Sequence, residues 1–145
     1  MKPDPEHKLS DNVCFAVYSA NNAIIRAYRP LLEQYDLTFP QYLVMQALWC
    51  KDAISLTQLS QQTGLDLGSL TPIVKRLEVK ELLIRTKDQH DERKKVIQLT
   101  EFGLGIRTEA LELKQTLLEK VSLCEDELVQ LRDQCLKVVK ELDIK

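Results

Sequence analysis

Residues 55–99, SLTQLSQQTGLDLGSLTPIVKRLEVKELLIRTKDQHDERKKVIQL, carry the clearest structural signals in the chain. They begin with the sequence of a capping box, in which Ser55 and Gln58 satisfy each other's free backbone N–H groups at the start of a helix. Gly64 can adopt the left-handed conformation that ends such a helix. A short helix is therefore expected between the capping box and Gly64.

A second helix and two short strands follow this first helix. Because Pro72 belongs in the first turn of a helix, we expect the second helix to start near Gly68 or Ser69. Strands joined by a polar loop are expected at residues 83–87 and 96–99. The apolar residues of the second helix recur at helical spacing: Leu70, Ile73, Val74 and Leu77.

This order of elements is typical of a DNA-binding helix-turn-helix followed by a hairpin. Such a unit places its second helix in the major groove, and Arg93 at the hairpin tip is placed to reach the minor groove or nearby phosphates. Residues 66–99 carry eight Lys or Arg and six Asp or Glu, whereas the whole chain has a formal net charge of −2. The local charge favours DNA binding. The same pattern also fits a small α+β domain with a surface hairpin.

Length and composition limit the other possibilities. The chain has 145 residues, enough for one domain with an oligomerisation element. No apolar run approaches the roughly 20 residues of a membrane span, and residues 1–6 lack the apolar core of a secretory signal. We therefore expect a cytoplasmic protein whose four cysteines are reduced thiols.

Two helices are expected before the helix-turn-helix. The first covers residues 9–28, with Ser10 or Asp11 as its cap, and Pro30 should interrupt it. Residues 42–49 are apolar on almost every side, so they are expected to form the buried central helix of the domain.

Two more helices are expected after the hairpin. Thr100 is the expected N-cap of a long helix that reaches Val121, and residues 122–125 are a second capping box that starts the last helix. Apolar residues of the last helix have the spacing of a coiled-coil seam: Leu128, Leu131, Cys135, Val138 and Leu142. These helices have more apolar surface than one small domain covers. They predict a homodimer, whose two reading helices would meet half-sites about 34–36 Å apart.

Several short motifs are similar to those of a known family. They are Leu70-Thr71-Pro72 with Lys75-Arg76-Leu77-Glu78, and Asp91-Glu92-Arg93 with Leu99-Thr100. With the order of the helices, they resemble the MarR family of winged-helix regulators. The resemblance implies a mainly α fold with a small β hairpin: a winged helix-turn-helix DNA-binding domain at residues 38–100, and a helical dimerisation region at residues 1–37 and 101–145. The implied partner is a pseudo-palindromic double-stranded DNA operator.

The N-terminal residues resemble one branch of this family, the organic hydroperoxide resistance regulators. The matching residues are Cys14-Phe15, Tyr18, Tyr28, Pro30-Leu31-Leu32 and Thr38-Phe39-Pro40-Gln41-Tyr42. The resemblance implies that Cys14 is a peroxide-reactive thiol, and that Tyr18 and Tyr28 bond it across the dimer interface. A third tyrosine of the branch falls at Phe39, which has no hydroxyl.

The position of Cys14 supports this chemistry under one condition. If Asp11 is the N-cap, Cys14 lies at the third position of the helix, where the helix dipole and free N–H groups favour a thiolate. Tyr18, one turn further on, can then donate to the sulfur. The other interpretation is that Cys14 is a small hydrophobic residue of the core.

A second thiol can convert an oxidised cysteine into a disulfide. Cys124 is the preferred resolving residue, because the first turn of the last helix lowers a thiol pKa, and Cys135 on the apolar seam is the second choice. The resemblance implies that such a distal cysteine comes from the other subunit. The alternative is that both are buried and inert, and Cys50 is expected to be structural.

The expected DNA contacts follow from the two faces of the second helix and from the hairpin. The candidates for base contacts are Leu67, Ser69, Thr71 and Lys75. The candidates for the DNA backbone or the minor groove are Arg76, Arg85, Lys87 and Arg93. Asp91 is placed to orient the Arg93 guanidinium, while Lys94 and Lys95 fit a solvated tip equally well.

These features lead to a hypothesis with three alternatives. We expect a cytoplasmic homodimeric repressor without cofactor or metal, released from DNA when an organic hydroperoxide oxidises Cys14. The first alternative is a MarR-type regulator gated by a small aromatic ligand. The second is a thiol peroxidase, although neither His7 nor His90 is placed to act as a base for a cysteine. The third is a helical interaction module that does not bind DNA.

Overall fold

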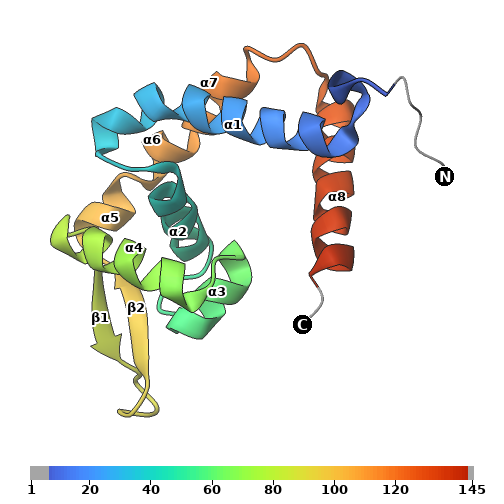
Figure 1. Cartoon of the computed structure of the whole chain (residues 1–145). Coiled ribbons are helices and arrows are strands. Elements are labelled where there is room, and N and C mark those ends of the chain that lie inside the picture. The colour runs from blue at the N-terminus through green and yellow to red at the C-terminus, as the bar shows by residue number, and fades with distance from the viewer. Residues whose placement is uncertain (1–6, 144–145) are drawn as a thin grey trace. The chain divides into compact units, whose positions relative to one another are not determined.

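The computed structural model describes residues 7–143 and divides the chain into two compact units, Met1–Lys114 and Gln115–Lys145. The first unit contains η1 (Leu9–Asp11), α1 (Val13–Leu32), η2 (Glu33–Tyr35), α2 (Phe39–Cys50), α3 (Leu56–Thr63), α4 (Leu67–Val79), β1 (Leu83–Lys87), β2 (Lys95–Leu99), α5 (Glu101–Gly105) and α6 (Arg107–Leu111) (Figure 1). Helix α7 (Leu113–Leu118) crosses the boundary, and α8 (Glu125–Leu142) belongs to the second unit. The mainly helical fold with one antiparallel hairpin confirms the predicted fold class.

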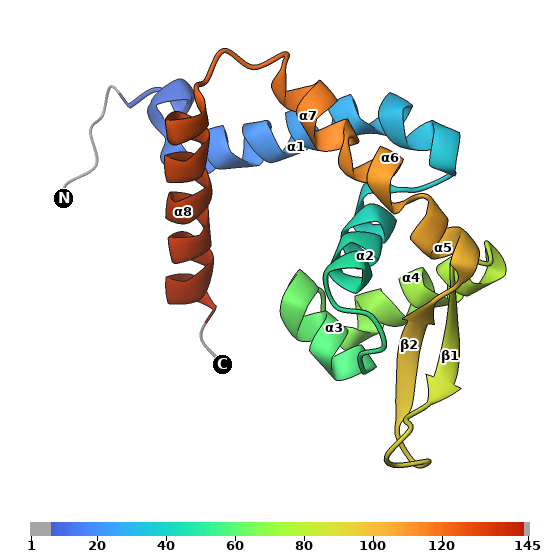
Figure 2. The ribbon, with the colours of Figure 1, turned by 180° about the vertical axis from the view of Figure 1, so that it is seen from behind.

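Helix α2 lies at the centre of the first unit, as the sequence predicts. Its side chains Val44, Met45 and Leu48 are fully buried, and the helix contacts α1, α3, α4 and β2. The Tyr42 hydroxyl donates to the Ala110 carbonyl oxygen at 2.6 Å, and the indole N–H of Trp49 donates to the Gly103 carbonyl oxygen at 2.9 Å. These two bonds attach α5 and α6 to the core helix, on the side visible in Figure 2.

The helix-turn-helix forms from local capping signals. Ser55 and Gln58 make the predicted capping box, with N···O distances of 3.1 and 3.0 Å, and Gly64 ends α3 at a φ of 74°. The predicted start of the second helix is wrong by one or two residues. Asp66 accepts the Ser69 N–H, so that α4 starts at Leu67 and its proline lies beyond the first turn.

The hairpin matches the prediction, with β2 starting one residue earlier, at Lys95. Its register pairs Leu83 with Leu99 and Arg85 with Ile97. Ile97 also bridges to Ile54, in the connection before α3, so the hairpin base is attached to the helices. Leu83, Ile97 and Leu99 are buried, which fixes the helix-facing side of the hairpin.

Two predictions about the first helix are wrong. Its N-cap is neither Ser10 nor Asp11 but Asn12, whose side-chain oxygen accepts N–H groups of the first turn. The helix also continues through Pro30 to Leu32. Burial of Leu32 in the core offsets the hydrogen bond that a proline cannot make in the last turn.

The long helix predicted over residues 100–121 is also wrong, because the structure divides it into α5, α6 and α7. Thr100 caps α5 as expected. The helix then ends at Gly105, two residues after Gly103, and two glycines this close weaken a helical segment. The second capping box lies two residues later than predicted: Cys124 is the N-cap, and its N–H donates to Glu127 at 3.1 Å.

Within residues 7–143, no helix is both long enough and apolar enough to cross a membrane. The proposed division into a DNA-binding domain at residues 38–100 and a dimerisation region on either side stays a prediction.

Gly103 tests the packing of α5 against the corner before the hairpin. A Cβ at this position would lie 2.0 Å from the Leu82 carbonyl oxygen, so the backbone must move to accept it. We expect Gly103→Ala to lower the free energy of unfolding by about 2–4 kcal/mol in urea titrations. The control is Gly105→Ala, where a Cβ would meet nothing within 4 Å. An equal cost for both variants would contradict this explanation.

Tyr42 gives a prediction at alkaline pH. The pKa of its hydroxyl is raised to about 12, mainly by burial and to a smaller extent by the neighbouring Tyr28 and Tyr35. Because the unfolded pKa is about 10, the stabilisation is complete below pH 10 and disappears as the pH rises through about 12. In urea titrations over this range, we expect wild-type stability to fall more steeply than that of Tyr42→Phe. Parallel curves would contradict the assignment.

Candidate DNA-binding surface and thiol site

The accessible face of α4 carries the residues predicted to contact bases. Leu67, Ser69 and Lys75 are exposed and Thr71 is half-buried, while Leu70, Val74 and Leu77 are packed in the core. The Thr71 hydroxyl donates to the Leu67 carbonyl oxygen at 2.8 Å, so its oxygen remains available only as an acceptor. Arg76 is also exposed, beside Lys75.

The hairpin, or wing, carries three predicted cations in two different environments. Lys87 is exposed, and the Arg93 side chain at the tip is 92% exposed. Arg93 donates from Nε to Asp91 Oδ1 at 3.2 Å, which is the orienting contact that the sequence predicts. Arg85 differs, because its Nε donates to Glu78 Oε1 of α4 at 2.7 Å. The sequence gives no signal for this partner, which lies seven residues earlier in the last turn of a helix.

The N-terminus of α4 carries a negative charge close to this face. The side-chain hydrogen bond from Ser69 is the largest cause that holds the pKa of the Asp66 carboxyl below its usual value. The exposed carboxylate is therefore ionised at neutral pH. It satisfies the first turn of the helix in place of an outside anion.

The corner that follows α4 is tied to the chain before α2. The Lys80 ammonium donates to the Asp36 carbonyl oxygen and, at 2.8 Å, to Gln41 Oε1. Gln41 is only 3% exposed, and the same oxygen accepts the Thr38 N–H at 3.2 Å. The sequence gives no signal for this contact, because it joins residues about forty positions apart.

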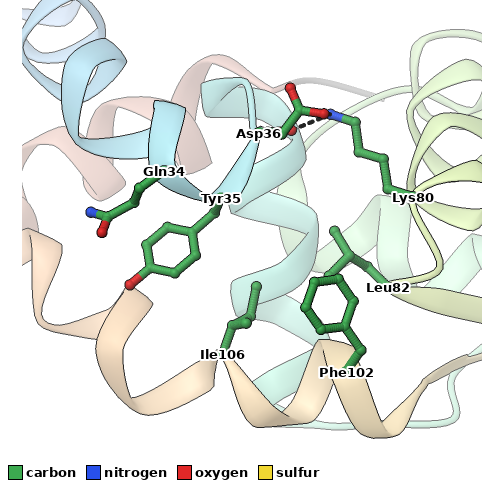
Figure 3. A pocket seen from close by; sticks show the side chains of 7 residues that line it. All are labelled: Gln34, Tyr35, Asp36, Lys80, Leu82, Phe102 and Ile106. Carbon is green, nitrogen blue, oxygen red and sulfur yellow. Dashed lines mark hydrogen bonds and ion pairs between the residues drawn. The ribbon is translucent and has the colours of Figure 1, made fainter.

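A cavity of about 510 Å³ lies beside this corner, in the first unit (Figure 3). Apolar side chains of α5 and of the corner form one wall, and polar groups of η2 and its following residue form the other. The lining residues are Gln34, Tyr35, Asp36, Lys80, Leu82, Phe102 and Ile106. The Tyr35 hydroxyl donates to Glu109 at 3.4 Å, and burial is the largest cause that raises its pKa, followed by the Glu109 charge.

Cys14 is exposed in the first turn of α1, and its N–H donates to Asn12 Oδ1 at 2.8 Å. Because Asn12 is the cap, Cys14 is the second helical residue and not the third, but it keeps the predicted place at the helix N-terminus. Within the single chain it is not part of the core. Tyr18, which is also exposed, follows one turn later on the same face.

The other two residues of the predicted thiol pocket lie elsewhere in the unit. Tyr28 is buried, with ring centroids 5.3 Å from Phe39 and 5.6 Å from Tyr42. Tyr28 lies fourteen positions after Cys14 on the same continuous helix, which is about 21 Å along the axis. One protomer therefore does not bring Cys14 together with Tyr28 or Phe39.

The remaining cysteines are also thiols in the structure. Cys124 is exposed and is the N-cap of α8, so its predicted place in the first turn is wrong by two positions. Cys135 is half-buried, and Cys50 is exposed at the end of α2 and not enclosed in the core. Among the described residues, no cluster of His, Cys, Asp and Glu could hold a metal ion.

The helix-turn-helix, the wing and their exposed cations define the chain as a winged-helix protein. Residues 26–109 match the family model of the transcriptional regulators SarA/Rot. The organic hydroperoxide resistance transcriptional regulator of Bacillus subtilis (strain 168) is 32% identical over 135 residues, which is 93% of this chain and 92% of that protein. The chain therefore belongs to the SarA/Rot family of transcriptional regulators, which share the MarR-type winged-helix fold, and it is a DNA-binding regulator.

Solved structures give the same assignment. Reduced AbfR of Staphylococcus epidermidis, bound to DNA, is 28% identical with a TM-score of 0.74, over 92% of this chain and 93% of that one. Overoxidised AbfR was also solved bound to DNA. CouR from Rhodococcus jostii RHA1, bound to p-coumaroyl-CoA, has a TM-score of 0.83 at 23% identity, over 97% of this chain and 100% of that one. This last likeness shows the fold alone.

Lys80 gives a prediction for the corner. We expect Lys80→Met to lower the free energy of unfolding by about 1–2 kcal/mol, because a half-buried cation with two oxygen acceptors is lost. Lys80→Arg keeps the charge and should recover part of the loss. The control is Lys51→Met, which removes an exposed lysine just after α2. Equal urea midpoints for Lys80→Met and wild type would show that the corner does not depend on this contact.

Proposed function

We propose that this regulator is a homodimeric repressor, released from its operator when an organic hydroperoxide oxidises Cys14. The observation that carries the proposal is an exposed thiol at the N-terminus of α1. An exposed cysteine is accessible to a peroxide, which reacts with the thiolate form of the side chain. The similarity to an organic hydroperoxide resistance regulator supports the same chemistry.

Exposed apolar residues support the dimer. In the first unit they include Leu9, Val13, Phe15, Val17, Tyr18 and Ile24. In α8 of the second unit they include Val129, Leu131, Leu136, Val138, Val139 and Leu142. Monomeric proteins rarely leave apolar faces of this extent in water. An antiparallel contact between two α1 helices would bring Cys14 and Tyr18 of one protomer toward Tyr28 and Phe39 of its partner.

The proposed chemistry has two steps. The Cys14 thiolate attacks the peroxide O–O bond, which yields a sulfenic acid and an alkoxide that takes a proton from water and leaves as the alcohol ROH. The thiolate of the partner's Cys124 then attacks the sulfenic sulfur, which forms a disulfide and releases hydroxide, and the hydroxide takes up a proton from solvent to become water. Cys135 is the second choice, because it is the less exposed of the two. The disulfide would displace the helices that set the distance between the two readers.

A disulfide, and not oxidation as such, is the proposed cause of release. Overoxidised AbfR is found bound to DNA, so an oxidised relative need not leave it. A sulfenic acid adds one oxygen atom to one chain, whereas a disulfide joins two chains and constrains their spacing. Release should therefore require the second cysteine.

In the DNA complex, we assign base contacts to Leu67, Ser69, Thr71 and Lys75 on the accessible face of α4. Arg76 and Lys87 would contact phosphates. Arg93, held by Asp91 at the wing tip, would enter the minor groove.

The test measures operator affinity before and after one equivalent of an organic hydroperoxide. We expect wild type to lose affinity about 10- to 100-fold, Cys14→Ser to show no change, and Cys124→Ser to respond weakly. Cys50→Ser is the matched control, because this exposed thiol has no part in the mechanism and the variant should respond as wild type. A full response in Cys14→Ser, or no response in wild type, would contradict the proposal.

The cavity favours a second candidate, a regulator gated by a small ligand. Its apolar wall, which includes Phe102 and Ile106, suits a small aromatic molecule, and the structural neighbour CouR is bound to p-coumaroyl-CoA. The Cys14→Ser variant of such a regulator would still release DNA when the ligand is added. Salt-dependent DNA binding that responds to neither peroxide nor aromatic acids would contradict both candidates.

A further inference from the structure

We propose that the Glu78–Arg85 ion pair sets the angle between the reading helix and the wing, which makes Arg85 a positioning residue and not a phosphate contact. Glu78 lies in the last turn of α4, and Arg85 is the middle residue of β1. The pair therefore joins the two elements that would enter neighbouring grooves of the operator. The proposal rests on the assignment of α4 and the wing as the DNA-binding elements, and it does not depend on the redox mechanism.

The geometry of the pair favours a fixed contact. Arg85 Nε and Glu78 Oε1 are 2.7 Å apart, and the two side chains are only 31% and 34% exposed. Arg93 at the wing tip is 92% exposed. A charge-assisted bond at this distance is strong, and partial burial protects it from the screening that weakens exposed pairs.

The register of the hairpin places Arg85 on the inner side of the wing. Arg85 pairs with Ile97, and the side chains of directly opposed residues lie on the same face of a two-stranded sheet. Ile97 is buried and also bridges to Ile54. The stem of Arg85 therefore starts from the helix-facing side of the wing.

The backbone between Glu78 and Arg85 leaves the tilt of the wing relative to α4 for the ion pair to restrict. Helix α4 ends with the Leu82 N–H bonded to the Leu77 carbonyl at 3.0 Å and the Glu81 N–H bonded to the Glu78 carbonyl at 2.9 Å. Glu81 takes the left-handed conformation, with a φ of 63°. These bonds fix the corner itself. Beyond the corner, the backbone bridge of Ile97 to Ile54 anchors the base of the wing, and among the described residues the Glu78–Arg85 pair is the ion pair that joins α4 to β1 directly.

The charge of the pair gives a second reason to exclude a phosphate contact. The Glu78 carboxylate neutralises the Arg85 guanidinium, so the pair as a whole contributes little attraction for DNA. At the wing tip, Arg93 Nε and Asp91 Oδ1 are 3.2 Å apart, which is a longer distance, and the Arg93 side chain remains in solvent. Arg85 would have to leave Glu78 to reach a phosphate.

Salt dependence separates the two roles. Loss of one phosphate contact lowers the slope of log K against log salt by about 0.9, whereas loss of a positioning contact lowers affinity at every salt concentration and leaves the slope unchanged. The measurement uses the reduced full-length protein and a duplex selected from random sequence by rounds of binding. Circular dichroism gives the folded fraction of each variant.

We expect Arg85→Met and Glu78→Gln to weaken operator binding by a similar factor, about tenfold, with the wild-type slope. The double variant with Glu78→Arg and Arg85→Glu should recover most of this affinity, because it restores the pair with reversed charges. Glu81→Gln is the matched control, since it removes an exposed carboxylate of the same corner, and it should bind as wild type. If Arg85→Met does not fold, the Glu78→Gln variant and the double variant decide the question.

Three results would overturn the proposal. The first is a slope lowered by about 0.9 in Arg85→Met together with unchanged or tighter binding in Glu78→Gln, which would make Arg85 a phosphate contact. The second is a loss of thermal stability with unchanged affinity of the folded protein. The third is failure of the charge-reversed double variant to recover affinity. None of these results involves peroxide, so the redox proposal stands or fails separately.

Discussion

The first unit depends on two hydrogen bonds that side chains of the central helix α2 donate to neighbouring helices. Tyr42 and Trp49 donate to carbonyl oxygens of α6 and α5, at 2.6 and 2.9 Å, from positions that are almost closed to water. Removing either donor would leave a buried backbone carbonyl without a partner, which costs more than the bond itself contributes. The same helix packs on α1, α3, α4 and β2, so the reading helix, the wing and the thiol-bearing helix share one support.

The corner after α4 is the second point at which these elements meet. Lys80 joins it to Asp36 and to the buried Gln41, and the pair of Glu78 with Arg85 joins it to the wing. The reading helix is thus held at its C-terminal end on two sides, while its N-terminal half is accessible to DNA. This arrangement gives each reader a fixed shape. In the proposed homodimer, control of DNA binding would then come from the spacing of the two readers, which agrees with the proposed disulfide between subunits.

Local signals made much of the fold predictable. The capping box at Ser55, the left-handed Gly64 and the two short strands each depend on neighbours in sequence, and the structure has them where expected, with β2 starting one residue earlier. The failures have non-local or competing causes. Burial stabilises α1 across Pro30. Gly103 and Gly105 divide a segment whose periodicity predicted one long helix, and Asn12 caps α1 in place of the two residues that were expected to do so. The exposed face of α4 follows from helical spacing, but the partners of Arg85 and Lys80 do not. The proposed Cys14 pocket needs residues of two protomers, so it depends on the dimer contact and not on local sequence signals.

The central claim is that a bond between subunits changes the distance between two rigid readers. The most direct measurement places a spin label at the exposed Thr57 of α3 by a chemistry that does not use cysteine, and records the distance within the dimer. We predict one distance distribution in the reduced protein and a shift of several ångströms after one equivalent of hydroperoxide. The shift should disappear in Cys14→Ser and be small in Cys124→Ser. Loss of operator binding with an unchanged distance distribution would contradict the account.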